Sequence, residues 1–411
     1  MDIGNYLDEI KKEEARNKEF LHLTANENQL SKTARMFLGS KLSERYFFGP
    51  GNGSGIVEAG SFVGLGLKSV NDIIVAAKEA AKDMLHAADV NLNVLSGVHA
   101  MMSSILSTTN PGDVVMTVPH EYGGHFATEG ILERTGRKHV FADFNMSTLS
   151  FDVEKIANKF EESNAKALYL DVSYYLNPHN LREIRRAIGE DPIIIYDASH
   201  TMGLIMGQRF QSPLEEGANV ISANTHKTLP GPHKGMVAFR DKELADKANA
   251  IIDGSLYSTP HTTHLIALST TILEMKEFGQ AFAEQIISNS NAIGQAFESL
   301  GYDVRKANTG RYSENHQAHV FIDNKGDHLD LYKNLINNNI ITNFEGEELS
   351  GGRWFIRVGT QEITRRGMKE TEMAQIANLV DRAMKGLNVK DEVLAINKNF
   401  PNIFFSFDKD E

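Results

Sequence analysis

The segment NVISANTHKTLPGPHKG, residues 219–235, places a lysine, Lys227, just after an apolar run. The next residues, Thr228 to Gly235, include two prolines and two glycines, which prevent a helix from starting there. Lys227 is therefore expected at a strand end or in a tight loop. In an open α/β sheet, ligands bind at the carboxyl ends of the strands, which is where an amine meant to react with an aldehyde should lie. Taken alone, Thr-His-Lys is more typical of a surface lysine.

A second residue favours the chemical interpretation. Asp197 follows the apolar run Ile193 to Tyr196, so a carboxylate is expected at the end of a buried strand. Such a position is costly for an ion unless it meets a cation. A protonated pyridine nitrogen would be that cation, and a protonated ring is the electron sink that stabilises a carbanion. Lys227 and Asp197 together predict a site for pyridoxal 5′-phosphate, with Lys227 holding the cofactor as a Schiff base.

The elements that would position these residues are short apolar runs that alternate with helical segments. Runs of strand length occur at 113–118, 166–173, 192–197 and 219–224. Helical spacing of apolar residues occurs at 71–87, 99–109 and 181–189. Near-continuous apolar strands between helices are typical of a mainly parallel sheet that helices cover on both faces. We therefore expect an α/β large domain.

The pattern changes after about residue 265. A long helical stretch at 263–301 precedes two strand candidates, 316–323 and 353–359, and a further helix near 369–386. This order is typical of a smaller α+β domain. We expect an N-terminal arm with a large cofactor-binding domain over 1–265 and a small C-terminal domain over 266–411.

Composition excludes several classes of protein. The chain of 411 residues has a formal net charge of −12, which argues against nucleic acid or a membrane surface as the main partner. It has no cysteine, so disulfides, thiolate catalysis and sulfur-ligated metals are excluded. The polar start and the lack of any apolar run of about 20 residues predict a cytoplasmic protein without a signal peptide or membrane span.

Five sequence blocks, in order, resemble the serine hydroxymethyltransferase family over most of the chain. They are LTANEN (23–28), LSGVHA (95–100), HEYGGHFATEG (120–130), the block 196–235 and WFIRVGTQEITRRGMKE (354–370). The resemblance implies the aspartate-aminotransferase-like fold of pyridoxal-phosphate-dependent transferases, also called fold type I. It also implies a homodimer with a shared active site, and an amino-acid substrate.

The resemblance assigns roles that physical chemistry supports. A small-residue turn that leads into a helix offers backbone N–H groups to a phosphate. Arg357, central in an apolar strand-like run, would bind an α-carboxylate through its two-pronged guanidinium. By contrast, we expect Arg365 and Arg366 at a solvated helix start. The implied cofactor contacts are the phosphate turn Ser96, Gly97 and Val98; His125 stacked on the ring; Ser173 at the phenolic oxygen; His200 beside the ring; and Thr225 and His226 near the phosphate.

Departures from the family concern the reaction type. Folate-dependent members have a Lys-Tyr-Ala-Glu-Gly stretch with a catalytic glutamate, and here Tyr46 is kept while Phe48 stands at the glutamate position. Phenylalanine cannot move a proton or hydrogen-bond a pterin. The phosphate-reaching loop of the neighbouring subunit is replaced by STPHTTH (258–264), where Thr262 and Thr263 offer hydroxyls. The family's serine has become Asn26, which can still touch a substrate carboxylate.

Several motifs are similar to the threonine transaldolases within this family. These enzymes cleave threonine and add the remaining amino-acid fragment to another aldehyde. Our leading hypothesis is an enzyme that makes or breaks the Cα–Cβ bond of a β-hydroxy-α-amino acid, without folate and with a small aldehyde as second partner. Tyr46, Glu27, His200 or a water would take the proton of the β-hydroxyl, and the sequence does not choose among them.

Two alternatives use the same residues. A pyridoxal-phosphate-dependent aminotransferase or decarboxylase would need the same lysine, aspartate and arginine, and a non-catalytic homologue would only bind the cofactor. The histidine pairs His120/His125 and His261/His264 lack acidic partners at useful spacing, so no metal site is expected from them. The sequence leaves the identity of the substrates, the stereochemistry and the use of folate open.

Overall fold

The computed structural model describes residues 3–323, 325–347 and 352–408. The chain divides into two compact units. Of the described residues, unit 1 contains those up to Glu27 together with Gln285–Phe404, and unit 2 contains Asn28–Glu284 together with 405–408. Each unit is described by itself below.

Unit 2 is built on a seven-stranded sheet in the order β4-β12-β11-β10-β9-β5-β6. Only β12 runs antiparallel to its neighbours in this sheet, which confirms the prediction of a mainly parallel sheet. Every residue of β9, β11 and β12 is buried, as expected for strands covered on both faces. The strands are β4 (Asp89–Asn91), β5 (Val114–Thr117), β6 (Lys138–Phe141), β9 (Ala167–Leu170), β10 (Ile193–Asp197), β11 (Val220–Asn224) and β12 (Gly235–Phe239).

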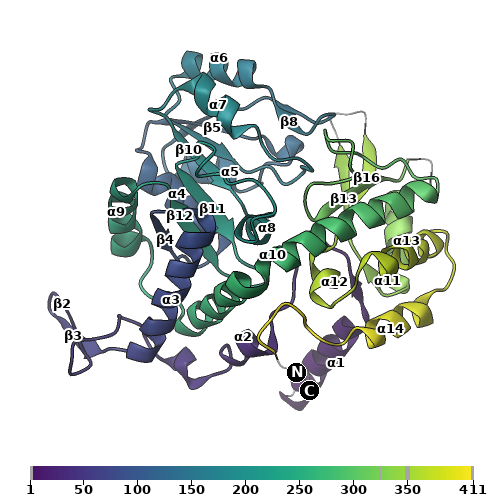
Figure 1. The fold of residues 1–411 in the computed structure, drawn as a ribbon, viewed down its shortest axis with the longest axis horizontal. Coiled ribbons are helices and arrows are strands. Elements are labelled where there is room, and N and C mark those ends of the chain that lie inside the picture. Colours follow the sequence, from purple (N-terminus) through teal and green to yellow (C-terminus); the bar gives the residue numbers. More distant parts are fainter. Residues whose placement is uncertain (1–2, 324, 348–351, 409–411) are drawn as a thin grey trace. The chain divides into compact units, whose positions relative to one another are not determined.

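Helices cover this sheet, and α4 (Gly97–Thr108) contacts β10, β11 and β12 (Figure 1). Its buried side chains join those of the central strands in one apolar core, which anchors the N-terminus of α4 against the sheet. The other helices of unit 2 are α2 (Lys32–Met36), η1 (Lys41–Glu44), α3 (Lys68–Leu85), η2 (His120–Tyr122), α5 (Thr128–Arg134), α6 (Val153–Ser163), α7 (Leu181–Ile188), α8 (Met202–Met206), α9 (Lys242–Ile251) and η3 (Ile252–Leu256). Two hairpins complete it: β2 (Ile56–Ala59) with β3 (Phe62–Leu65), and β7 (Phe144–Asn145) with β8 (Ser150–Phe151).

Unit 1 has its own apolar core around a three-stranded antiparallel sheet in the order β13-β16-β15. A separate parallel pair, β1 with β14, ties the N-terminal segment to the C-terminal part of the chain. The strands are β1 (Leu21–His22), β13 (Gln317–Phe321), β14 (Ile340–Ile341), β15 (Asn343–Glu347) and β16 (Arg353–Gly359). The helices are α1 (Ile3–Glu19), α11 (His328–Asn337), α12 (Gln361–Arg365), α13 (Glu370–Met384) and α14 (Lys390–Asn399).

The bounds of the two units differ from the domains expected at 1–265 and 266–411. Residues before Asn28 belong to unit 1 because Leu21 and His22 pair with Ile340 and Ile341. The helix α10 (Thr262–Ser299) also runs without a break past residue 265, and the boundary between the units falls within it. Sequence periodicity predicts the long helix, but it cannot show the pairing of β1 with β14 or the point in α10 at which the units divide, because both depend on contacts between distant segments.

The prediction that Arg365 and Arg366 form a solvated helix start is wrong. Arg365 is 0% exposed. The guanidinium of Arg366 donates hydrogen bonds to Asn397 Oδ1 at 2.8 Å and to the carbonyl oxygens of Asn397 and Phe400 at 2.8 and 3.0 Å. The end of α14, which the sequence pattern did not indicate, therefore supplies hydrogen-bond acceptors to Arg366.

Among the described residues, no helix combines the length and the apolar character that crossing a membrane requires.

Candidate active site

The lysine loop connects β11 to the antiparallel strand β12, so Lys227 lies just beyond the carboxyl end of β11, as predicted. Thr225 holds the loop together, since its hydroxyl donates to Pro232 O at 2.6 Å and accepts from Lys234 N at 3.1 Å. The Lys227 ammonium nitrogen lies 3.1 Å from His200 Nε2. The structure thus brings together Lys227 and His200, which the sequence singled out separately.

Asp197 is the last residue of β10, the parallel neighbour of β11. Lys227 and Asp197 therefore follow adjacent strands and lie at the same edge of the sheet. The hydroxyl of Tyr169 donates to Asp197 Oδ2 at 2.5 Å, and Ser199 N donates to Oδ1 at 2.8 Å. Burial raises the pKa of Tyr169, and the charge of Asp197 reinforces the shift, so the phenol keeps the proton that it donates.

His125 follows the short helix η2 and two glycines that the fold requires. Gly123 has a φ of +89°, and a Cβ atom on Gly124 would lie 2.1 Å from Val118 O. Ser173 closes this turn, because its hydroxyl donates to Gly123 O at 2.8 Å. Burial lowers the pKa of His125, while the charges of Asp197 and Lys227 act on it with opposite signs. His125 therefore shares the electrostatic environment of the two residues that define the site.

Sequence reasoning missed Asp171, which lies beside this group. Its Oδ2 accepts hydrogen bonds from the Thr128 hydroxyl at 2.6 Å and from His125 N at 3.1 Å. Burial raises the pKa of Asp171 to about 7; the Thr128 hydrogen bond opposes the shift and the charge of Asp197 adds to it. The available signal was the one used for Asp197, a carboxylate just after a buried apolar run.

The predicted phosphate turn lies at the N-terminus of α4. Ser96 is the N-cap residue, and its hydroxyl accepts from His99 N at 3.1 Å. A Cβ atom on Gly97 would lie 2.8 Å from Asn224 Cβ, so only glycine fits where the turn meets the end of β11. Val98 is partly exposed in the first turn. The first N–H groups of a helix lack intrahelical partners, so this turn has the donors and the small residues that a phosphate needs.

A second lysine of the loop, Lys234, was also missed. Its side chain is 1% exposed, and its ammonium donates to Leu92 O at 2.7 Å and Val94 O at 2.9 Å. Burial lowers the pKa of Lys234 to about 7. The stacked rings of His226 and His233, 3.9 Å apart, belong to the same loop. Lys234 thereby ties the lysine loop to the segment that leads into the phosphate turn.

Tyr46, Thr262 and Thr263 form a second group in unit 2, where they line a pocket of about 410 Å³. The Thr262 hydroxyl donates to Arg45 O at 2.8 Å. Tyr46 stacks on Phe48 with 5.5 Å between ring centroids, and Phe48 packs against Phe62 at 4.6 Å. The residue at the family's glutamate position is therefore part of an aromatic cluster beside this pocket.

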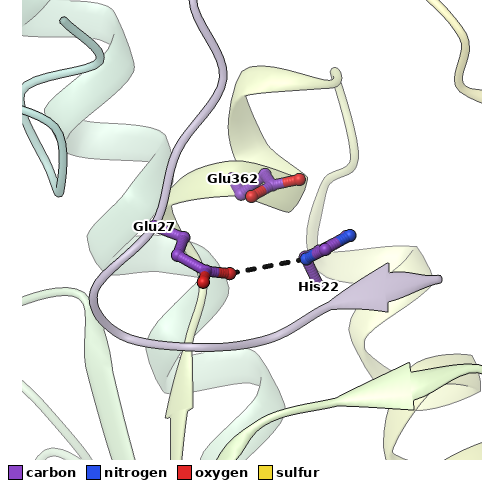
Figure 2. A group of neighbouring side chains, drawn as sticks. All are labelled: His22, Glu27 and Glu362. Carbon is purple, nitrogen blue, oxygen red and sulfur yellow. Dashed lines mark ion pairs between the residues drawn. The ribbon is translucent and has the colours of Figure 1, made fainter. Parts of the chain in front are cut away.

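The three remaining predicted residues, Asn26, Glu27 and Arg357, lie in unit 1. Arg357 is buried on β16 and pairs with Glu345 Oε1 at 3.0 Å. Asn26 is half-buried, whereas Glu27 is 52% exposed and lies 3.5 Å from His22 Nδ1 (Figure 2). The buried guanidinium confirms that Arg357 is an internal cation of its strand; its role toward a substrate stays a prediction.

Comparison with known proteins supplies the decisive observation. The family model described as serine hydroxymethyltransferase matches residues 3–380. The chain belongs to the serine hydroxymethyltransferase family. It is accordingly a pyridoxal-phosphate-dependent enzyme of fold type I that acts on an amino acid.

The chain is similar to enzymes of two types, hydroxymethyltransferases and transaldolases. Serine hydroxymethyltransferase from Methanosphaera stadtmanae is 33% identical over 401 residues, which are 95% of this chain and 93% of that protein. Fluorothreonine transaldolase from Streptantibioticus cattleyicolor is 34% identical over 380 residues, 90% of this chain and 58% of that longer protein. The solved structure of L-threonine transaldolase from Pseudomonas fluorescens in its internal aldimine state has a TM-score of 0.90 and 29% identity, and the match covers 100% of this chain and 95% of that one.

The residues of unit 2 fit the family's cofactor. The edge of the sheet presents an amine at Lys227, a carboxylate at Asp197 and an imidazole at His125, and the glycine-lined N-terminus of α4 offers donors to a phosphate. The amine would meet the aldehyde of the cofactor, the carboxylate its pyridine nitrogen, the imidazole its aromatic ring, and the donors its phosphate.

Proposed function

We propose that this enzyme cleaves a β-hydroxy-α-amino acid such as threonine at its Cα–Cβ bond and joins the amino-acid fragment to a second aldehyde, without folate. Making or breaking this bond is the chemistry of the family. The finer assignment rests on similarity to two transaldolases and on one feature of this chain, Phe48.

Phe48 carries the argument against folate. Transfer of a one-carbon unit to tetrahydrofolate needs a group that moves a proton at this position in the family, and a benzyl side chain has no such group. Its ring instead packs between Tyr46 and Phe62, so an apolar surface borders the pocket lined by Tyr46 and Thr262. Such a surface suits an uncharged aldehyde better than a polar pterin.

Each side chain of the site has one task in this reaction. When bound, pyridoxal phosphate supplies an electron sink for the negative charge that develops at Cα. Lys227 would hold the cofactor through its amine, Asp197 would keep the pyridine nitrogen protonated, and His125 would stack on the ring. Ser96, Gly97 and Val98, with Thr225 and His226, would bind the phosphate, and Ser173 and His200 would contact the ring substituents.

The substrate contacts are assigned in the same way. Arg357 and Asn26 bind the α-carboxylate, and Thr262 and Thr263 serve the phosphate of a neighbouring subunit in a homodimer. Tyr46, Glu27, His200 or a water takes the β-hydroxyl proton. The small aldehyde partner, the homodimer and the cytoplasmic location remain predictions from the sequence.

Product analysis tests the proposal. Purified holoenzyme is incubated with L-threonine and benzaldehyde, with and without tetrahydrofolate, and Lys227→Ala serves as the control. The expected products are acetaldehyde and the β-hydroxy-α-amino acid of benzaldehyde, formed equally without folate.

Other products would overturn the assignment. Hydroxymethyl transfer from serine that requires tetrahydrofolate would show a folate enzyme, and a keto acid or carbon dioxide would show an aminotransferase or a decarboxylase. Absence of turnover with any amino acid would leave a protein that only binds the cofactor.

A further inference from the structure

Unit 1 contains a cluster of three metal-ligating side chains that the proposed reaction does not use as a group. His22 ends β1, Glu27 follows in the next loop, and Glu362 lies on α12 (Figure 2). The ligand atoms of these residues all lie within 4.8 Å of one another. We propose that they bind a divalent transition-metal ion such as Mn²⁺ or Zn²⁺.

The His22 ring is oriented as in a metal site. Its Nε2 lies 3.3 Å from Asn17 O, a contact in which the ring N–H donates to the carbonyl oxygen. This contact fixes the tautomer and leaves the lone pair of Nδ1 directed toward Glu27, which is the arrangement that ligating histidines adopt. Nδ1 is buried and faces the Glu27 carboxylate across 3.5 Å, a distance at the limit of a hydrogen bond. An ion between these two groups would take both as ligands.

The spacing suits a metal better than a direct ion pair. His22 Nδ1 lies 3.5 Å from Glu27 Oε2, whereas a charge-assisted hydrogen bond would be about 2.7–2.9 Å long. Two ligands that each lie about 2.1 Å from one tetrahedral ion are roughly 3.4 Å apart. The Glu27 side chain is exposed enough to rotate, so small changes of its torsion angles can bring all three ligand atoms to one ion.

The backbone around the cluster is held in place. The side-chain amide of Gln361 donates to Thr24 O at 2.6 Å and to Glu27 O at 2.7 Å, so α12 fixes the loop that carries Glu27. The Thr24 hydroxyl donates to Glu27 Oε2 at 2.9 Å and orients the carboxylate. Glu362 is 5% exposed, and its charge acts on both His22 and Arg366. Supported ligands of this kind are typical of metal centres.

The donor set defines the class of ion. One imidazole and two carboxylates, without sulfur, favour Mn²⁺, Fe²⁺ or Zn²⁺, whereas Ca²⁺ and Mg²⁺ prefer oxygen alone. The exposed side at Glu27 leaves room for water as a further ligand. With its carboxylate on the ion, Glu27 is withdrawn from the residues that can take the β-hydroxyl proton, so Tyr46, His200 or water would serve instead.

Direct binding tests the site independently of catalysis. Tag-free holoenzyme is treated with a chelator, dialysed and titrated with Mn²⁺, and the free ion is followed by electron paramagnetic resonance. We expect one Mn²⁺ per chain that Zn²⁺ displaces, with affinity at least about tenfold weaker in His22→Ala and in Glu362→Gln. The matched control is His139→Ala, because His139 lies 3.8 Å from a single carboxylate, that of Glu129, and its loss should leave binding unchanged.

A thermal measurement keeps the proposal testable if a variant folds poorly. Zn²⁺ should raise the unfolding temperature of the unmodified holoenzyme, because a ligand that binds only the folded state stabilises it. Absence of saturable Mn²⁺ binding together with an unchanged unfolding temperature would overturn the proposal. Equal affinity in the two ligand variants and in the unmodified protein would do the same, and would place the ion elsewhere, for example on the cofactor.

Discussion

Two lysines of one loop, Lys227 and Lys234, have different environments and therefore different roles. Lys227 lies beside His200 at the edge of the sheet, where its amine can meet a ligand. Lys234 is buried, and two backbone carbonyl oxygens accept its hydrogen bonds. A lysine engaged in this way cannot reach a cofactor without breaking both bonds, so its function is to position the loop.

Replacing each lysine should separate these roles. Lys227→Ala should lose all covalent attachment of the cofactor, whereas Lys234→Met, which keeps a long side chain without the charge, should retain it. Borohydride reduction followed by peptide mass analysis measures the attachment. Equal labelling of the Lys227→Ala variant and the unmodified protein would show that another amine holds the cofactor.

The buried carboxyl of Asp171 should make stability depend on pH. Its pKa in the folded protein is about 7, above the ordinary value of 3.8, so the folded state binds the extra proton between these limits. The proton bound by Asp171 stabilises the folded state fully below about pH 4, and this stabilisation is lost as the pH rises through 7. Asp171→Asn removes this titration. The variant should therefore gain stability relative to the unmodified protein between pH 5 and pH 8, by an amount on the order of 2–4 kcal/mol.

Thermal unfolding of both proteins across that pH range measures the difference. Parallel stability curves for Asp171→Asn and the unmodified protein would contradict the assignment of this proton to Asp171.

At the scale of elements, the site depends on the close approach of α4 to the ends of β11 and β12. Gly97 faces Asn224, and a Cβ atom on Gly235 would lie 2.3 Å from Ser96 O. Backbone segments this close leave no volume for side chains. The N-terminus of α4 is therefore fixed against β11, the strand that leads to Lys227. The contact of Gly97 with Asn224 thus positions both the backbone N–H groups expected to bind a phosphate and the amine of Lys227.

Gly97→Ala should weaken cofactor binding, because its Cβ would lie 2.8 Å from Asn224 Cβ and displace the first turn of α4. We expect at least a tenfold rise in the dissociation constant of the cofactor, equivalent to about 1.4 kcal/mol. Gly130→Ala is the matched control, since this helical position has no atom within 4 Å of an added Cβ. The control should bind normally and gain about 0.5–1 kcal/mol in stability. Normal binding by Gly97→Ala would show that the turn does not hold the phosphate.

At the scale of the whole molecule, the predicted site residues are divided between the two units. Lys227 and Asp197 belong to unit 2, and Arg357 belongs to unit 1. Cofactor binding and carboxylate binding should therefore be separable by substitution.

Arg357→Ala should retain the cofactor and lose amino-acid affinity by roughly 100-fold, about 3 kcal/mol, the typical loss for one partner of a buried charge pair. Arg353→Ala is a control on the same strand, because Arg353 pairs with Asp303 and Asp323 at the surface and should affect neither affinity. Spectroscopic titration with glycine or threonine measures the amino-acid affinity, and titration of the apoenzyme with the cofactor measures the cofactor affinity. Unchanged affinity in Arg357→Ala would exclude it as the carboxylate ligand.

The sequence by itself determined the sheet class and the places of Lys227 and Asp197. Strands buried on both faces have near-continuous apolar runs, and proline and glycine exclude a helix after Lys227, so these features are local and can be read along the chain. The end of a strand also locates a ligand site before any contact is known, because parallel strands share their carboxyl edge.

Only the tertiary structure decided the environments of polar residues. Arg365 and Arg366 have the sequence pattern of solvated residues but are buried, and residues at the end of α14 accept the hydrogen bonds of Arg366. Nothing in the apolar run after Lys234 indicates that two backbone carbonyl oxygens accept hydrogen bonds from its ammonium. His22 and Glu362 meet although they are near opposite ends of the chain. Hydrogen bonds and charge pairs act between atoms a few ångströms apart in space, and a one-dimensional pattern does not contain those distances.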